Sequence, residues 1–329
     1  MSSRKLLGKS CEKPLLLGEQ KTKIDETRKL IGLPADRFPV LCLDASIARY
    51  LGARNWNIKK AAKMLKETLK WRMEYKPEKI RWGDIADEAE TGKIYRADYC
   101  DKHGRTVLVM RPGFQNTNSI RAQIRYLVYC LENAIMHLKP DQEQMVWLID
   151  FQGWNMSSIS VKATKETAHV LQNHYPERLG LAILYNPPKI FESFWMMVKP
   201  VLEPKTYKKV KFIYNDDPQS QKRMEELFDM EKLEFGFGGK NPVGFNYEAY
   251  RERMLEDDKK MTELTNSGSF DMGELQQDNG SENSDEATST CSGYASSFSL
   301  AGNEEKGQGG VNIDTDATKE TQMLDELAL

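Results

Sequence analysis

Strand-like and helical segments alternate between residues 93 and 214, and this order constrains the fold of the chain more than any other feature. Short apolar runs typical of buried strands stand at residues 145–151, 181–185 and 209–214. Segments with apolar residues every three to four positions separate them, at about 118–138, 159–175 and 189–202. Strands joined by a crossover helix run parallel, because the helix returns the chain across the sheet. We therefore predict an α/β fold with a mostly parallel sheet flanked by helices.

Two strands joined by a tight turn precede this alternation. Residues 93–99 and 105–111 have the pattern of strands, and Asp101-Lys102-His103-Gly104 lies between them. Glycine readily adopts the positive φ that such a turn needs, so Gly104 favours a hairpin.

Residues 21–90 show helical periodicity alone, which predicts a helical region ahead of the α/β domain of residues 91–245. Asp44 is predicted to cap a short helix in this region. Asn57 is predicted to cap a longer helix that stops before Pro77.

The two ends of the chain differ in composition from its centre. A charged helix is predicted over 246–264, whereas the Ser-rich residues 265–329 and the polar residues 1–20 lack periodicity. We therefore expect a disordered acidic tail and a flexible N-terminus. Residues 262–329 carry 14 acidic residues and two lysines, a net charge of −12, which leaves +10 on residues 1–261. A basic body is attracted to phosphate in nucleic acid, in an anionic membrane or in a phosphorylated ligand.

Missing motifs disfavour several classes of function. The chain has no GxSxG or HExxH pattern and no complete phosphate-binding loop, so we expect no catalytic residues, no metal and no cofactor. It lacks the aromatic motifs of nucleic-acid-binding modules, so no nucleic acid is expected as a partner. Its five scattered cysteines are typical of a reducing compartment, and no stretch reaches the ~20 apolar residues of a membrane span. We expect a monomeric, cytoplasmic protein that contacts membranes peripherally and transiently.

The predicted helix at 189–202 is apolar around most of its circumference. A surface helix has one apolar stripe, but here residues outside the stripe are apolar too. The helix is therefore either buried on two sides or a mobile lid over an apolar cavity, with methionines suited to varied partners. The side chains assigned to this gate or to the lipid pocket beneath it are Ile190, Phe191, Phe194, Trp195, Met197 and Val198, together with Met145 and Trp147 of the strand at 145–151.

The connection that follows, residues 203–209, gathers three lysines and a threonine hydroxyl. Such a cluster is usually a solvated loop, but Thr206 and Lys209 could also hold a phosphate together. Arg49 and Arg54 of the helical region either form ordinary ion pairs or bind phosphate through paired hydrogen bonds.

The sequence resembles the CRAL-TRIO lipid-binding family over residues 41–75 and 93–215. The matching motifs are Ile149-Asp150-Phe151-Gln152-Gly153, Tyr175-Pro176-Glu177-Arg178-Leu179-Gly180, Asn186-Pro187-Pro188, Lys199-Pro200, Pro204-Lys205-Thr206 with Lys209, and Phe237-Gly238-Gly239. The resemblance is strongest to the phosphatidylinositol-transfer branch. Members of the family bind one lipid in an apolar pocket gated by a helix, and they have no established catalytic centre.

This resemblance implies roles for individual residues. Phosphatidylinositol-binding members hold the headgroup with an Arg, a Glu, a Thr and a Lys, which correspond here to Arg54, Glu177, Thr206 and Lys209. The two cations can neutralise a phosphate, Thr206 can donate a hydrogen bond to it, and Glu177 can accept hydrogen bonds from inositol hydroxyls. Arg178 is expected to form a structural ion pair instead.

Three positions depart from the family pattern. Gly52 stands where members often have arginine. Met145 and Trp147 stand on a strand where members that also carry phosphatidylcholine have small hydroxyl residues. These large side chains argue against phosphatidylcholine exchange, and we expect Trp147 to reshape the cavity.

Three hypotheses follow for the function. The leading one is non-enzymatic binding of a phospholipid, with phosphatidylinositol as the expected ligand, and its transfer or presentation at anionic membrane surfaces. The second is a lipid-regulated sensor or adaptor that docks protein partners through its acidic tail. The third is a carrier of another hydrophobic ligand, such as a sterol, a tocopherol or a retinoid.

Overall fold

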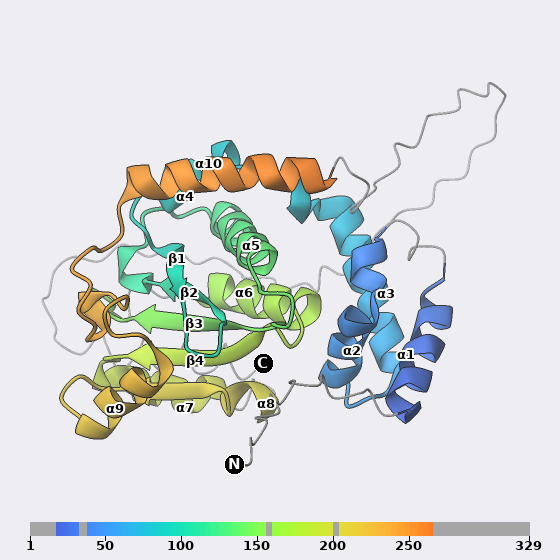
Figure 1. Cartoon of the computed structure of the whole chain (residues 1–329), viewed down its shortest axis with the longest axis horizontal. Coiled ribbons are helices and arrows are strands. Elements are labelled where there is room, and N and C mark those ends of the chain that lie inside the picture. Colours follow the sequence, from blue (N-terminus) through green and yellow to red (C-terminus); the bar gives the residue numbers. More distant parts are fainter. Residues whose placement is uncertain (1–17, 33–37, 156–159, 200–203, 266–329) are drawn as a thin grey trace, which may run out of the picture. The chain divides into compact units, whose positions relative to one another are not determined.

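The computed structural model describes residues 18–32, 38–155, 160–199 and 204–265 (Figure 1). The expectations for residues 1–17 and 266–329, which cover most of the flexible N-terminus and the acidic tail, lie outside the described residues. The first helix begins at Gly18, earlier than expected, so residues 18–20 belong to the helical region.

Five strands form one sheet in the order β1-β2-β3-β4-β5. Their bounds are Ile94–Cys100, Thr106–Met110, Met145–Asp150, Leu179–Tyr185 and Val210–Ile213. β1 and β2 form the predicted antiparallel hairpin with a φ of 76° at Gly104, and β2 to β5 run parallel. The predicted mostly parallel sheet is therefore confirmed.

β4 begins at Leu179, two residues before the predicted start. Gly180 is thus part of the strand rather than the end of a loop. A Cβ atom at Gly180 would lie 3.1 Å from the Gln144 side chain and 3.0 Å from the Arg105 guanidinium. The small residue at this position fits a close approach of neighbouring chains.

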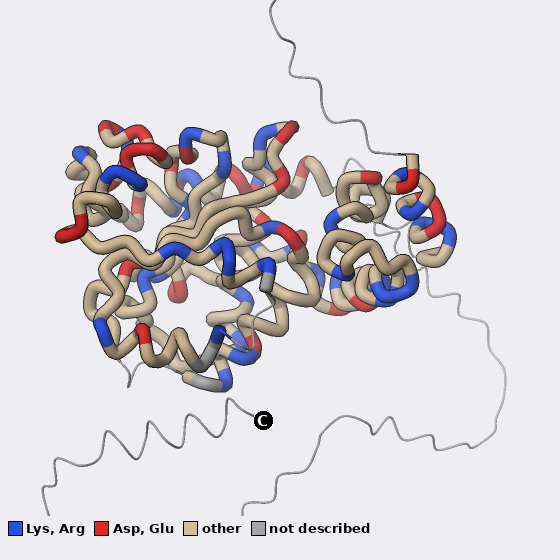
Figure 2. Tube along the Cα trace, turned by 90° about the horizontal axis from the view of Figure 1, so that it is seen from below, with Lys and Arg blue, Asp and Glu red and all other residues tan. Residues whose placement is uncertain are grey.

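The N-terminal helices α1 (Gly18–Ile31), α2 (Asp44–Ala53) and α3 (Ile58–Tyr75) pack around a hydrophobic core of their own. Charged residues of both signs lie along these helices (Figure 2). Asn57 caps α3 as predicted, because its Oδ1 accepts from the Lys60 amide at 3.0 Å. The capping role predicted for Asp44 is wrong: it is the first residue of α2, and its carboxylate pairs with Lys21 and Arg28.

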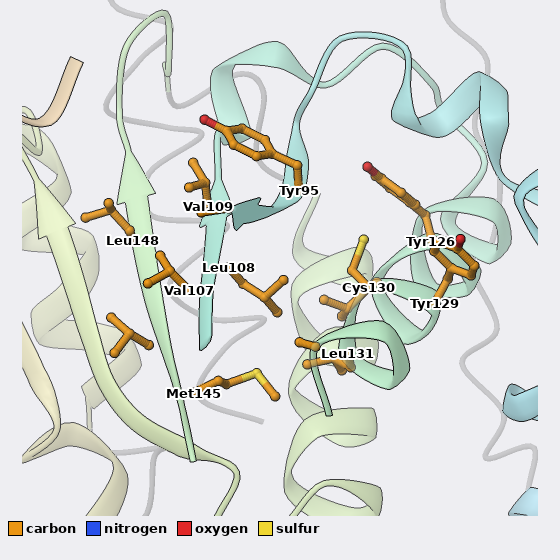
Figure 3. Close-up of a cluster of buried hydrophobic side chains, with 14 of the residues drawn as sticks. Tyr95, Val107, Leu108, Val109, Tyr126, Tyr129, Cys130, Leu131, Met145 and Leu148 are labelled. Atoms are coloured by element: carbon orange, nitrogen blue, oxygen red, sulfur yellow. The ribbon is translucent and has the colours of Figure 1, made fainter. Parts of the chain in front are cut away.

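Helices cover both faces of the sheet. α5 (Ile120–Met136) and α6 (Val161–His174) lie on one face, and α9 (Pro218–Leu227) with the residues after it packs on the other. Figure 3 shows Leu131 of α5 facing Leu108 and Met145, while Val107 and Leu148 point to the opposite side. The two faces therefore belong to one continuous core.

α7 (Lys189–Val198) and α8 (Pro204–Tyr207) follow β4 and lead into β5 (Figure 1). α7 confirms the predicted helix over its described part, whereas α8 was not anticipated from the sequence. The remaining short elements are α4 (Ala86–Ala89) and the 3₁₀ helices Pro39–Cys42, Pro77–Lys79, Trp82–Asp84, Pro112–Phe114 and Phe235–Phe237.

The helical region is tied to the α/β domain through α3. Arg72 makes two hydrogen bonds of 2.8 and 2.9 Å to Glu132 of α5, and Tyr175 donates to the same carboxylate at 2.6 Å. Trp71 stacks on His174 with ring centroids 4.1 Å apart. Because these groups are largely buried, the contact resists solvent and fixes the end of α2 beside the sheet.

The charged C-terminal helix α10 (Tyr247–Leu264) is also confirmed. Asp257 is buried and accepts hydrogen bonds from Arg96 of β1 and Asn133 of α5. α10 thus closes the same side of the domain as α5.

Candidate functional site

A cavity of about 270 Å³ lies against the face of the sheet that α5 and α6 cover. Side chains on alternate positions of a strand share a face. The register places Trp147, Ala182 and Val210 in one row across β3, β4 and β5, and all three line the cavity. Further apolar walls come from Leu131, Ile149, Ala168, Leu171, Leu179, Leu184 and Trp195.

One end of this cavity is polar and charged. Arg54, Glu177, Thr206 and Lys209, the four residues that the resemblance assigned to a headgroup, all line it. They come from the end of α2, the turn before β4, helix α8 and the residue before β5. The fold therefore brings together four residues that are distant in the sequence.

Lys209 and Glu177 form an ion pair in which Nζ lies 2.8 Å from Oε2. Their side chains are 22% and 24% exposed, so the pair is reachable from the cavity end and only partly screened by solvent. Arg54 donates from Nη1 to the Ala53 carbonyl at 3.2 Å, and Lys205 donates to the Gly52 carbonyl at 2.8 Å. The helical region and the residues before β5 thus meet at this end.

Glu177 has a backbone φ of 57°, in the left-handed region. A side chain with a Cβ is disfavoured there, and such residues cost ~1–3 kcal/mol when the surroundings enforce them. Such residues cluster at functional sites, where a required side-chain direction is kept despite the backbone strain.

Arg178 lies beside Glu177 but has a different environment. Its Nη1 donates to the Glu143 carboxylate at 2.9 Å and to the Glu143 carbonyl at 3.0 Å. Arg49 pairs with the same carboxylate. Burial and the neighbouring Arg49 guanidinium lower the pKa of Arg178 to about 10. The structural ion pair predicted for Arg178 is confirmed, and Arg49 likewise forms an ion pair.

α7 contributes to the cavity through Trp195. Phe191 and Phe194 pack in an aromatic cluster, with Phe191 4.4 Å from Phe151 and 5.5 Å from Phe194 between ring centroids. Ile190 is 45% exposed and faces away from this cluster's buried part. The side chains of Met197 and Val198 lie outside what the structure describes. The helix is therefore buried on its sheet side and apolar on part of its exposed side.

Of the two departures on β3, only Trp147 lines the cavity. Met145 lies on the same face but is fully buried in the core next to α5 (Figure 3). Met145 is therefore not among the residues that line this cavity, and its assignment to the lipid pocket stays a prediction.

The sequence reading missed the polar wall that α6 provides. Thr164, Thr167 and Gln172 line the cavity, although their composition is that of a solvated helix face. The sequence does not distinguish a polar helix residue that faces water from one that faces a cavity. Only the packing of α6 therefore identifies these three residues as part of the cavity wall.

Two kinds of site are not found among the residues that the structure describes. No group of three or more His, Cys, Asp or Glu side chains within these residues could hold a metal ion. No helix in the described part of the chain is long and apolar enough to cross a membrane.

A helical region followed by a five-stranded, mostly parallel sheet with a cavity under α6 defines a particular α/β architecture. Residues 89–239 match the model of the CRAL/TRIO domain, and this part of the chain has the CRAL/TRIO fold. The structure titled "Crystal structure of Sfh5" has the same fold, with a TM-score of 0.57 and 16% identity, and the match covers 76% of this chain and 98% of that one.

Curated relatives match somewhat under two thirds of the chain. A CRAL-TRIO domain-containing protein of Schizosaccharomyces pombe is 35% identical over 64% of this chain and 20% of its own length. Phosphatidylinositol transfer protein PDR17 of Saccharomyces cerevisiae is 31% identical over 66% of this chain and 62% of its own length. SEC14 cytosolic factor of Candida glabrata is 28% identical over 61% of this chain and 72% of its own length. The chain thus spans less than two thirds of the first two of these proteins.

Proposed function

We propose that this protein binds a phospholipid, with phosphatidylinositol as its ligand, and transfers or presents it at membranes without catalysing a reaction. The observation that carries the proposal is the meeting of Arg54, Glu177, Thr206 and Lys209 at one end of an apolar cavity. Relatives named as phosphatidylinositol transfer proteins support the same ligand.

The charges at this end suit an inositol phosphodiester. Arg54 and Lys209 supply two cations, and Thr206 supplies a hydroxyl donor. In the structure, Lys209 is paired with Glu177 at 2.8 Å. Binding exchanges this contact, because the ammonium turns to the phosphate while the carboxylate accepts from inositol hydroxyls. Both groups keep charge-assisted hydrogen bonds throughout, which limits the desolvation cost.

The size of the cavity requires α7 to move. About 270 Å³ is below the ~300–1,000 Å³ that hold drug-sized ligands, and a lipid with two acyl chains is larger than these. Trp195 of α7 forms part of the wall, so outward movement of α7 enlarges the cavity. α7 thereby acts as the gate.

The outer side of α7 fits a membrane surface. Met196 is 73% exposed and Ile190 45% exposed, and the exposed lysines Lys199, Lys205 and Lys208 follow in the chain. Apolar tips enter the headgroup layer, and lysines are attracted to anionic lipids. We propose a cytoplasmic protein that docks transiently through this surface.

A second candidate is a carrier of another hydrophobic ligand, such as a sterol. The narrow cavity with the large Trp147 side chain favours this candidate, because a rigid sterol needs less width than the two acyl chains of a phospholipid. The ligand itself distinguishes the two candidates.

Mass spectrometry of the lipid that co-purifies tests the proposal directly. Phosphatidylinositol at a ratio near one per chain supports it, and a sterol or an empty protein contradicts it. A liposome exchange assay with labelled phosphatidylinositol tests whether the proposed headgroup residues are needed for uptake. The Thr206→Ala, Lys209→Ala double variant is expected to lose uptake. Lys211→Ala, an exposed lysine on β5 outside the cavity lining, is the matched control.

A further inference from the structure

Trp147 has an unusual position in the cavity wall. Its ring lines the cavity, yet its Nε1–H is buried and has no hydrogen-bond partner among the residues that the structure describes. An indole N–H is a donor only, so no rotation of the ring converts it to another use. Buried donors without partners are rare, and each one calls for a physical explanation.

The surroundings offer no acceptor within the same row of the sheet. Trp147 is paired with Leu108 on one side and with Ala182 on the other, and both carry apolar side chains. Leu131 and Leu171 of the covering helices add further apolar wall. The polar side chains of α6 that line the same cavity, Thr164, Thr167 and Gln172, make no hydrogen bond to Nε1, so a ligand in the cavity is a candidate acceptor.

The sheet register fixes where that acceptor has to lie. Val210 is in the same row as Trp147 two strands away, and it directly follows Lys209. Adjacent strands are ~4.8 Å apart, which puts the Trp147 backbone about 10 Å from that of Val210. The Trp147 ring and Lys209 line the same cavity, so the part of a lipid a few bonds inward from a phosphate held by Lys209 is expected to pass the ring. In a glycerophospholipid the ester carbonyl oxygens of the glycerol occupy that place.

We propose that Trp147 donates a hydrogen bond from Nε1 to an ester carbonyl oxygen of the bound glycerolipid and so determines specificity for ester-linked lipids. The inference rests on the proposed function and extends it from the headgroup to the glycerol. The nitrogen is buried in the structure, so a lipid reaches it only when the cavity widens as proposed above. A ligand without an acceptor at this depth leaves the donor unpaired.

The test compares two forms of one lipid. Diester phosphatidylinositol and its dialkyl-ether analogue have the same headgroup and chain length, but only the first has the carbonyl oxygens. Uptake from vesicles is measured in competition for the full chain and for Trp147→Phe, which keeps an aromatic ring and removes the donor. The wild-type chain is expected to prefer the diester about fivefold, equivalent to ~1 kcal/mol. Trp147→Phe is expected to take up both forms to within twofold.

Trp195→Phe controls for loss of indole area in the same wall, since Trp195 also lines the cavity and its nitrogen is not among the buried donors without partners. It is expected to retain the fivefold preference whatever its total uptake. An unchanged preference in Trp147→Phe overturns the inference, as does an absence of preference in the wild type. Failure of the wild-type chain to take up the diester overturns the proposed function as well.

Discussion

The Lys209 ammonium lies 2.8 Å from the Glu177 carboxylate, although 31 residues separate the two in the sequence. Both side chains line the same cavity, and together with Arg54 and Thr206 they form its polar end. In the proposed site a phosphate takes the place of the carboxylate at Lys209, and Glu177 then accepts hydrogen bonds from hydroxyls of the headgroup.

Replacing Lys209 by alanine is expected to weaken uptake of phosphatidylinositol by roughly ten- to hundredfold, since a charge-assisted hydrogen bond to the phosphate is lost. Vesicle exchange with labelled lipid measures the change. Lys211→Ala removes an exposed lysine of β5, two residues further along the chain, and is expected to behave like the wild type. Equal uptake by the two variants would show that the phosphate lies elsewhere.

Replacing Glu132 by alanine is expected to destabilise the fold by about 3–5 kcal/mol, because the buried Arg72 guanidinium loses its two close carboxylate contacts. Urea denaturation of the purified protein gives the free energy of unfolding. Glu74→Ala disrupts the exposed pair between Glu74 and Lys70, which lies on α3 as Arg72 does. It is expected to change stability by less than about 0.5 kcal/mol. A similar small effect for both variants would contradict this account of how α3 is held.

Stability is expected to fall between about pH 6.5 and pH 4 because of His174. Burial, with His169 and Arg72 nearby, lowers the pKa of His174 to about 4. The unfolded chain binds a proton near pH 6.5 while the folded chain does not, so acid favours unfolding by up to ~3 kcal/mol across this window. Denaturation curves at pH 7, 5.5 and 4.5 measure the loss.

The His174→Gln variant removes the titrating group and is expected to flatten this pH dependence. His103→Gln changes an exposed histidine and serves as the control, with the slope of the wild type expected. A His174→Gln slope equal to that of the wild type would assign the pH dependence to other groups.

Introducing a charge at Met196 is expected to reduce binding to anionic vesicles at least fivefold, because an aspartate there has to leave water to enter the headgroup layer. Sedimentation with vesicles measures the bound fraction. Phe235→Asp alters a residue of similar exposure, 76% against 73%, outside α7. If the two variants lose binding equally, α7 is not the membrane-facing element.

The order of elements could be predicted from the sequence because local patterns encode it. Short apolar runs and helical spacing identified β3, β4, β5 and the helices between them, and Gly104 marked the hairpin. The one-turn helix α8 was missed because four residues are too few to show a helical period. Asp44 was misjudged as a cap since its partners Lys21 and Arg28 come from another helix.

The four residues of the polar site were named from family motifs, but their meeting at one cavity end depends on tertiary structure. Arg54 reaches the site because α3 docks on α5 and α6 through Arg72 and Trp71. The environments of Met145 and Trp147 also depend on tertiary structure, although the two residues share a strand face. α5 covers Met145, whereas Trp147 lines the cavity.

The sequence by itself thus determined the alternating α/β order, the hairpin and the residue types available for an anionic ligand, since these follow from local periodicity and composition. Only the tertiary structure decided that Glu177 pairs with Lys209, that Arg178 turns instead to Glu143, and that the Trp147 donor is left without a partner among the described residues. The reason is that each of these features depends on which segments far apart in the chain lie next to one another. The distances between such segments are set by the register of the sheet and the packing of helices upon it.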